Sequence, residues 1–315
     1  MKTKNKLLTL LILSASTAVT TAIINKCIKY SATSKNILSD SKALCYKWRF
    51  GNIHYTKAGT GKPLLLIHDL TTCSSGHEWN QMVNYLKEQY TVYTIDLLGC
   101  GRSEKPDLTY TNYLYVQMIS DFVKSEIGHR TNVIASGSSS PLAVMACNQS
   151  PELFDQIMLI NPDSLLTCSQ IPNKHGRAYK FILDLPILGT LLYHIATSKQ
   201  TIMEELSNNF FNPYSVNTSL VDAYYESAHL GDSPKSLYAS VRCNYTKCNI
   251  VNALKKINNS IYIIGGCEME NIDESSREYQ IYNPAIESSL ISNSKYLPQL
   301  ENPFELYRAI QMFFV

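Results

Sequence analysis

The stretch DLLGCGRSEKP, residues 96–106, decides the fold of this chain. It follows an apolar run, Thr91–Asp96 (TVYTID), which has the composition of a buried β-strand. Gly99 and Gly101 allow a tight backbone turn soon after that strand ends. An earlier apolar run, Pro63–His68 (PLLLIH), is typical of a strand covered on both faces. The stretch therefore predicts a loop at the end of a buried strand.

The same pattern continues on both sides of this loop. Arg49–Tyr55 reads as a strand upstream, and the chain downstream alternates further apolar runs with helical stretches. Strands that alternate with helices predict an α/β fold with a doubly wound, mostly parallel sheet. The further strands are expected at Asn132–Ser136, Gln156–Asn161, Ser260–Gly265 and Ile286–Ile291, and the helices at Trp79–Gln89, Tyr110–Glu126, Leu142–Gln149 and Pro303–Phe314.

Residues from about 164 to 256 break this alternation. They are nearly all helical or loop, are rich in aromatic side chains, and carry helix stops at Pro186 and Pro213. A helical insertion between two strands of such a sheet lies over its carboxyl edge, where these folds bind ligands. We therefore expect a helical cap over a pocket.

The amino terminus has the features of a membrane anchor. Three lysines precede an uncharged run, Leu7–Ile24, and Lys26 and Lys29 follow it. A helix of that length spans about 27 Å, close to the hydrocarbon core of a bilayer. A cleaved signal peptide is the alternative, because small residues occur at 16–18 and 20–22. We expect a membrane-anchored protein or, alternatively, a secreted one.

These patterns divide the chain into three parts. An anchor or signal segment covers 1–28, a linker covers 29–47, and an α/β domain covers 48–315 with its cap at about 164–256. The sequence does not decide on which side of the membrane the α/β domain lies. The lysine excess at the amino end favours a domain outside the cytosol, whereas many unpaired cysteines favour a reducing compartment.

Composition excludes several classes of partner. The net charge is +2, from 28 basic and 26 acidic residues, and no basic cluster interleaves with aromatics, so nucleic acid is not an expected partner. The 9 cysteines are scattered without a CxxC pair. This spacing argues against a disulfide framework and a zinc site, and we expect neither metal nor cofactor.

Two motifs together resemble the α/β-hydrolase family of lipases, esterases, dehalogenases and peroxidase-like proteins. Residues 96–106 match the D-x-x-G-x-G-x-S-x-K-P stretch of that family, and His68-Asp69 stands where the family shows His-Gly. The resemblance runs from about Trp48 to Val315 and is weakest over the cap. It implies this fold and a Ser-His-acid triad, but it indicates fold far better than substrate.

The resemblance implies a nucleophilic serine on the sharp turn after the strand Asn132–Ser136. Small residues are expected two positions before and two after that serine. Ser139 is the first candidate because Gly137 precedes it by two, although Pro141 stands at the second small position. Ser138 is the fallback.

The oxyanion hole would use two backbone N–H groups. By resemblance, these belong to Ser140, if Ser139 attacks, and to Leu70. Asp69 departs from the family glycine. A carboxylate beside a site meant to hold negative charge is unfavourable unless it points away.

The acid of the triad is ambiguous. The family pattern G-x-x-D after the late strand places Met269 at the acid position, and Glu268 and Glu270 flank it. Asp163, just past another strand, is a further candidate. Each of the three also fits a solvated surface carboxylate.

The histidine position holds a tyrosine. The family loop G-H-x-P-x-x-E-x-P aligns with residues 295–303 (KYLPQLENP), which places Tyr296 where the histidine belongs. Serine needs a base near neutral pH, and tyrosine is a poor one. Loss of a triad member typically costs about 10⁴ to 10⁶ in turnover. A cap histidine is the candidate for a replacement base, whereas His68 is expected to be structural; the cap histidines are His175, His194 and His229.

The sequence thus predicts a catalytically impaired or non-catalytic relative of these hydrolases, with a capped pocket for a small apolar ligand or a protein partner. The alternative is an active serine hydrolase of the esterase or lipase type, which cleaves a small apolar ester through Ser139 and an unusual base. A membrane-tethered binding or scaffold protein is the second alternative.

Overall fold

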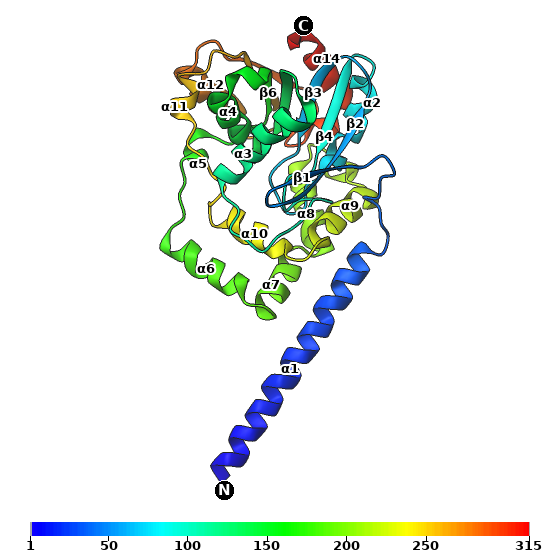
Figure 1. The fold of residues 1–315 in the computed structure, drawn as a ribbon, viewed down its shortest axis with the longest axis vertical. Coiled ribbons are helices and arrows are strands. Elements are labelled where there is room, and N and C mark those ends of the chain that lie inside the picture. The colour runs from blue at the N-terminus through cyan, green and yellow to red at the C-terminus, as the bar shows by residue number, and fades with distance from the viewer. Residues whose placement is uncertain (1, 315) are drawn as a thin grey trace.

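A computed structural model describes the backbone of residues 2–314 and the side chains of residues 18–314. Its centre is an eight-stranded sheet in the order β1-β2-β4-β3-β5-β6-β7-β8. From β4 to β8 every neighbouring pair is parallel, and β2 is antiparallel to both β1 and β4. The predicted, mostly parallel sheet is confirmed (Figure 1). The strands are β1 (Leu44–Trp48), β2 (Gly51–Ala58), β3 (Lys62–Ile67), β4 (Tyr90–Ile95), β5 (Thr131–Ser136), β6 (Phe154–Ile160), β7 (Ile261–Gly266) and β8 (Glu287–Ile291).

Helices cover both faces of the sheet. Successive side chains of a strand point to opposite faces, so apolar strands present an apolar surface on each side. Along β3, Leu65 and Ile67 belong to one hydrophobic core, and Leu64 and Leu66 belong to the other. The first core includes α3 (Asn112–Phe122), α4 (Ser140–Gln149) and α12 (Ile272–Tyr282). The second includes α2 (Asn80–Leu86) and α14 (Pro303–Phe313).

The amino-terminal edge of the sheet differs from the prediction. The strand expected over 49–55 corresponds to β2, and an additional strand, β1, precedes it and forms a hairpin with it. β1 begins at Leu44, inside the range expected to be a linker. Its side chains Tyr46 and Trp48 pack on the apolar surface of the domain. Tyr46 packs edge-on against Phe122 of α3, with ring centroids 5.8 Å apart.

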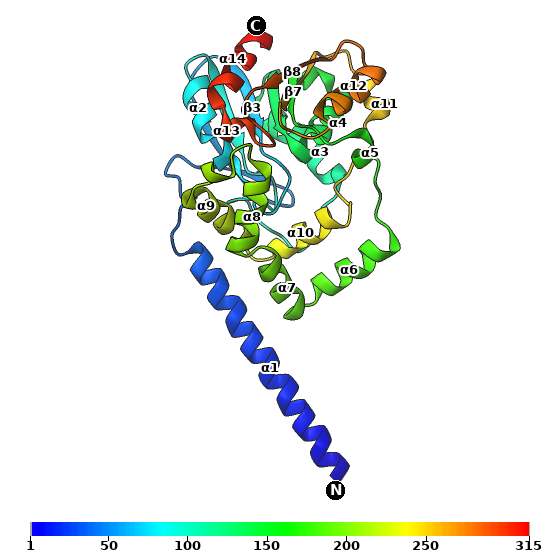
Figure 2. The ribbon, with the colours of Figure 1, turned by 180° about the vertical axis from the view of Figure 1, so that it is seen from behind.

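The cap is helical, as the sequence predicts, and it lies beside the loops that follow β3 and β4 (Figure 2). The side chain of Ser227 in α9 joins both loops: its hydroxyl donates to the Ser74 carbonyl and accepts from the Gly101 N–H. The cap helices are α5 (Leu165–Cys168), α6 (Lys174–Asp184), α7 (Leu188–Ala196), α8 (Lys199–Asn209), α9 (Thr218–His229), α10 (Pro234–Arg242) and α11 (Val251–Leu254).

Helix α1 (Lys2–Thr33) extends away from the domain, and its carboxyl-terminal part contacts the cap (Figure 1). The Asn25 amide donates to the Ile187 carbonyl beside α7, and the Lys29 ammonium donates to the Gly231 carbonyl after α9. Within the described part of the chain, no helix is both long and apolar enough to cross a membrane. The predicted anchor, Leu7–Ile24, lies in large part (7–17) outside the residues whose side chains are described.

Candidate functional site

The turn between β5 and α4 has a glycine at its apex. β5 ends at Ser136, a single 3-10 turn covers Gly137–Ser139, and α4 begins at Ser140. Gly137 has a φ of +54°, in the left-handed region that favours glycine. Small residues, Ala135 and Ser139, stand two positions before and after it. The spacing that the family requires around its nucleophile is therefore met at Gly137, which has no side chain.

Ser139, the first candidate nucleophile, is packed inside the domain. It is fully buried, and its hydroxyl donates to the His68 carbonyl at 2.6 Å. Ser140 is also engaged: its hydroxyl donates to the Ala135 carbonyl, and its N–H donates to the Gly137 carbonyl. Neither the Ser139 hydroxyl nor the Ser140 N–H has the free position expected from the sequence, because the apex of the turn is Gly137, two residues before Ser139.

Ser138, the fallback, lies in a polar cluster with Asp163 and Lys247. Its hydroxyl donates to Asp163 Oδ2 at 2.8 Å and accepts from Lys247 Nζ at 3.1 Å. Lys247 Nζ also forms an ion pair with Asp163 Oδ2 at 2.7 Å. The structure thus brings two sequence candidates together and adds a lysine that the sequence analysis missed. Lys247 lies in the loop between α10 and α11, which has no recognisable motif, so no sequence signal points to it.

Asp69 fills the space beside the glycine apex. Its Oδ1 accepts the Ser138 N–H at 2.8 Å, its Oδ2 accepts the Tyr296 hydroxyl at 3.2 Å, and the Leu70 N–H also bonds the carboxylate. An added Cβ at Gly137 would lie 2.3 Å from Asp69 Oδ1 and 2.7 Å from the Tyr296 hydroxyl. The two N–H groups that would form an oxyanion hole around this turn, those of Ser138 and Leu70, therefore bind a carboxylate of the protein itself.

Burial raises the pKa of Asp69 to about 6, and the nearby charge of Asp163 adds to that rise. The Ser138 N–H and the charge of Lys247 oppose it. Near neutral pH most of the population therefore carries a negative charge at Asp69, held by backbone donors.

Tyr296, at the histidine position, is a neutral hydrogen-bond donor. Burial, followed by the charge of Asp69, raises its pKa well above the usual value of 10. Its loop is fixed by backbone contacts: the Tyr296 N–H donates to the Asn209 carbonyl at 3.0 Å, and the Asn161 amide donates to the Tyr296 carbonyl at 2.9 Å. A phenol with a raised pKa keeps its proton and does not act as a base near neutral pH.

A second buried carboxyl group, Glu78, lies close to Asp69. The Tyr224 hydroxyl of α9 donates to Glu78 Oε1 at 2.9 Å, and Gln299 Nε2 contacts Oε2 at 3.4 Å. Burial, with the charge of Asp69 as the next cause, raises the pKa of Glu78 to about 7. Glu78 links the cap to the body of the domain beneath the site.

The other acid candidates lie elsewhere. Glu268 and Glu270 are exposed on the turn after β7, on either side of the half-buried Met269. The Glu268 N–H donates to the Ser294 carbonyl. Of the three carboxylates considered, the structure places only Asp163 in the cluster around Ser138.

None of the histidines joins this cluster. His68 is fully buried, contacts the Asp69 carbonyl through Nδ1 at 2.6 Å, and accepts the Leu97 N–H on Nε2 at 3.0 Å. Burial lowers its pKa to about 4, so it is neutral and structural, as expected. His194 and His229 stack on each other with ring centroids 4.9 Å apart, beside a cavity that residues of α1 also line, and His175 is exposed on α6.

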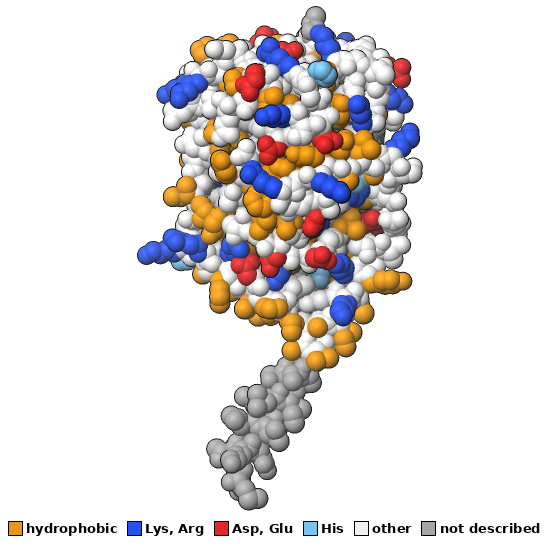
Figure 3. Space-filling view, viewed as in Figure 1, with side chains coloured by type: hydrophobic (Ala, Val, Ile, Leu, Met, Phe, Trp, Pro, Cys, Tyr) orange, Lys and Arg blue, Asp and Glu red, His pale blue; other side chains and the backbone are white. Residues whose placement is uncertain are grey.

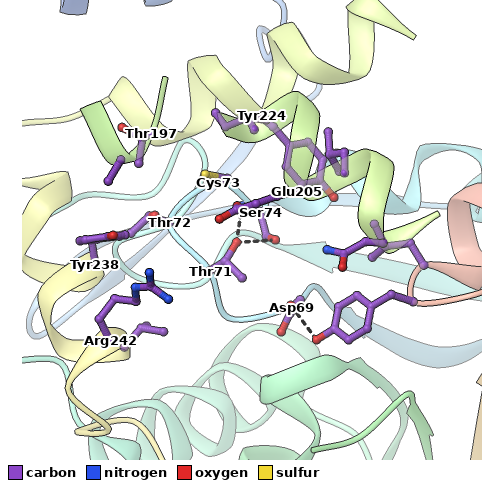
Figure 4. Close-up of a pocket in the computed structure, with 17 residues that line it drawn as sticks. Asp69, Thr71, Thr72, Cys73, Ser74, Thr197, Glu205, Tyr224, Tyr238 and Arg242 are labelled. Carbon is purple, nitrogen blue, oxygen red and sulfur yellow. Dashed lines mark hydrogen bonds between the residues drawn. The ribbon is translucent and has the colours of Figure 1, made fainter. Parts of the chain in front are cut away.

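A cavity of about 210 Å³ opens between the cap and this site (Figure 4). Asp69 and Tyr296 line it from the body of the domain, and Glu205 and Arg242 line it from cap helices, where both are exposed. The remaining lining combines polar groups with apolar and aromatic side chains: Thr71, Thr72, Cys73, Ser74, Ala196, Thr197, Ile202, Leu206, Asn209, Tyr224, Tyr238, Val241 and Leu297. In the described residues, no group of three or more His, Cys, Asp and Glu side chains could hold a metal ion.

Comparison with known proteins supports the same fold. Residues 62–214 match a family model described as the alpha/beta hydrolase fold. A 2-hydroxy-6-oxo-6-(2'-aminophenyl)hexa-2,4-dienoic acid hydrolase of Metapseudomonas resinovorans is 32% identical over 138 residues, which are 41% of this chain and 47% of the relative. A soluble epoxide hydrolase of Corynebacterium sp. (strain C12) is 29% identical over 110 residues, which are 35% of this chain and 37% of the relative. The chain thus spans half or less of the length of these curated relatives.

Solved structures match over most of the chain at low identity. A serine hydrolase involved in carbazole degradation has a TM-score of 0.71 at 14% identity and covers 86% of this chain and 98% of its own. A membrane phospholipase A described as a bacterial virulence factor has a TM-score of 0.68 at 18% identity, with 99% of this chain and 98% of its own covered. At these identities the likeness concerns the fold alone.

Proposed function

The chain belongs to the α/β-hydrolase fold family, and we propose that it is a non-catalytic member that binds a small ligand in its capped pocket. The observation that carries the proposal is the turn after β5, whose apex is Gly137 with a φ of +54°. A member of this family that lacks a side chain at that apex has no nucleophile in the position from which its relatives attack.

Two further replacements support the proposal. Catalysis of this type needs a base that takes the proton of the nucleophile and a pair of N–H groups that stabilise an oxyanion. Tyr296 is a hydrogen-bond donor that keeps its proton, and the carboxylate of Asp69 occupies the Ser138 and Leu70 N–H groups. Removal of a triad member typically costs about 10⁴ to 10⁶ in turnover, and the loss of the oxyanion hole costs about a further 10² to 10³.

A hydrolase that uses Ser138 is the second candidate, because the Ser138 hydroxyl contacts both Asp163 and Lys247. The charges argue against it. Lys247 Nζ is paired with the Asp163 carboxylate at 2.7 Å, and an ammonium group has no lone pair with which to accept the serine proton. Two backbone N–H groups at this turn, those of Ser138 and Leu70, already bond Asp69.

Ester hydrolysis separates the two candidates. We expect purified protein to cleave p-nitrophenyl acetate and butyrate at the same slow rate as its Ser138→Ala and Ser139→Ala variants. The matched control is Ser150→Ala, outside the site. A native rate that falls by about 100-fold or more in Ser138→Ala alone would establish the hydrolase instead.

We also propose that the chain is held at a membrane by α1. The support is the uncharged run Leu7–Ile24 and the position of the helix, which leaves the domain at the cap. At that end of the molecule exposed hydrophobic side chains gather around the base of α1 (Figure 3). They include Val19, Ile23 and Ile24 of α1, Phe181 and Ile182 of α6, and Leu188 and Ile195 of α7.

A further inference from the structure

The ligand that suits this pocket follows from the charge that Asp69 supplies. In a working hydrolase of this fold the N–H groups beside the elbow receive an oxygen of the substrate as it becomes negative. Here Asp69 supplies a carboxylate to the same donors, the N–H groups of Ser138 and Leu70, and its Oδ2 also accepts the Tyr296 hydroxyl. The anion site is filled from within the chain.

The filled site still has capacity for a donor. A carboxylate offers about four acceptor positions, and Asp69 uses three of them, for Ser138, Leu70 and Tyr296. Asp69 also lines the cavity. A ligand that donates a hydrogen bond therefore finds an acceptor in Asp69, at the floor of the pocket. A ligand carboxylate, or the partly negative oxygen of a carbonyl group, is instead repelled by the Asp69 carboxylate.

The charged neighbours of Asp69 do not reverse this preference. The charge of Asp163 raises the pKa of Asp69, and the charge of Asp69 raises the pKa of its neighbour Glu78. The cation of the cluster, Lys247, is paired with Asp163. From the cap, Tyr224 contributes a neutral hydroxyl that donates to Glu78. The floor of the pocket is therefore negative overall.

The walls suit an apolar body behind a small head group. Ile202, Leu206 and Leu297 line the cavity, and all three are buried. Tyr224 and Tyr296 add aromatic faces, which attract cations. At the cap side, the cation Arg242 lies over the Tyr238 ring at 5.7 Å, next to the carboxylate Glu205.

We propose that the pocket selects an organic cation, a primary ammonium head on a small apolar body, with the ammonium bound to Asp69. The inference rests on the binding function proposed above and assigns its ligand class. Asp69 thereby changes an oxyanion site into a cation site by occupying the donors and presenting its own charge.

Isothermal calorimetry with three probes of matched shape tests this assignment: 2-phenylethylammonium, 2-phenylethanol and 3-phenylpropanoate. At about pH 7.5, above the pKa of Asp69, we expect the ammonium to bind at least about 10-fold more tightly than the carboxylate. Asp69→Asn should lower the affinity for the ammonium by about 10-fold or more, and the affinity for the alcohol by less than about 3-fold. Glu152→Gln, which neutralises an exposed carboxylate outside the pocket, is the matched control and should change the affinity for the ammonium by less than about 3-fold.

A pH titration of the native protein gives a second readout that needs no variant. Ammonium affinity should fall as the pH is lowered from about 7.5 to 5, because Asp69 becomes protonated, while alcohol affinity stays level. Equal or tighter binding of the carboxylate, no binding of any probe, or a level ammonium titration would overturn the assignment. Ester turnover through Ser138 would instead defeat the non-catalytic proposal and leave this selectivity standing, so the two failures are distinguishable.

Discussion

At the scale of single residues, Gly137 and Asp69 depend on each other. A side chain at position 137 would collide with the Asp69 carboxylate, because an added Cβ lies 2.3 Å from Oδ1. The carboxylate in turn relies on the N–H of Ser138, which is directed toward it by the turn that Gly137 makes. Changing only one of these two residues to the one that catalytic relatives have therefore does not restore a working site.

Restoring a hydrolase needs three coordinated substitutions. We expect Gly137→Ser, Asp69→Gly and Tyr296→His together to raise p-nitrophenyl acetate hydrolysis by about 100-fold over Gly137→Ser alone, since a serine, a base and a free oxyanion hole are then all present. The measurement is the initial rate under identical conditions. The double variant that retains Asp69 is the control and should show no gain. If it equals the triple variant, Asp69 does not block the hole.

Ser139 gives a stability prediction instead of a catalytic one. Because its buried hydroxyl bonds the His68 carbonyl at 2.6 Å, Ser139→Ala should lower the free energy of unfolding by about 1 kcal/mol. Ligand affinity should stay unchanged. Urea denaturation followed by circular dichroism measures the first quantity. A fully stable Ser139→Ala variant that loses ligand binding would mean that this hydroxyl faces the pocket.

The residue scale is also where sequence reasoning was least informative. The segment ASGSSSP offers three consecutive serines, and the search for a nucleophile favoured one of them. The signal that identifies the apex was present, because Ala135 and Ser139 are the small residues two before and two after Gly137. What the sequence does not contain is the backbone angle at Gly137, which decides which residue occupies the turn.

At the scale of elements, the stretch 96–106 was predictable because one buried charge fixes it. Asp96 is fully buried, and its carboxylate accepts the Gly76 N–H at 2.6 Å as well as the N–H and Nε of Arg102, each at 2.8 Å. The guanidinium holds the pKa of Asp96 well below its usual range. The loop geometry fixes the spacing of these residues along the chain, so the motif can be recognised from the sequence.

Arg102 is the partner whose loss tests this interpretation. We expect Arg102→Met to lower the free energy of unfolding by about 3 kcal/mol, because the buried Asp96 charge loses its counter-ion. Arg308→Met is the matched control: Arg308 pairs with Glu305 on the surface, and its loss should cost about 0.5 kcal/mol or less. Equal effects of the two substitutions in urea denaturation would show that the loop does not depend on the buried pair.

The buried strands were predictable for a related reason. β3, β4, β5, β6 and β7 are rich in apolar side chains, and each contributes to both hydrophobic cores. β1 was missed because it lies at the edge of the sheet, where most of its side chains are exposed and the apolar pattern is weak. Contacts between distant segments, such as Lys247 with Ser138, depend on the cap fold and leave no local pattern.

At the scale of the whole molecule, the cap, the pocket and α1 form one arrangement. α9 contacts the site through Tyr224 and Ser227, and the segments beside α7 and α9 hold the end of α1 through Asn25 and Lys29. A tether at the amino end would therefore place the cap, and the cavity beneath it, next to the surface to which the chain is attached.

Membrane attachment is testable by substitution in the uncharged run. We expect the full chain to sediment with phospholipid vesicles after a carbonate wash, and Ile12→Arg with Leu13→Arg to release most of it, because charged side chains are costly in the bilayer core. Tyr214→Arg, at a cap residue that is 97% exposed, is the control and should not change sedimentation. Sedimentation that is unaffected by the paired arginines would rule out attachment through this run.

The central claim is that the turn after β5 carries no activated serine. Exposure of the native protein to a fluorophosphonate probe, followed by intact-mass and peptide analysis, tests it most directly. We predict no adduct on Ser138 or Ser139 under conditions that label an ordinary serine esterase to completion. A stoichiometric adduct on either serine, formed at an esterase-like rate, would contradict the account.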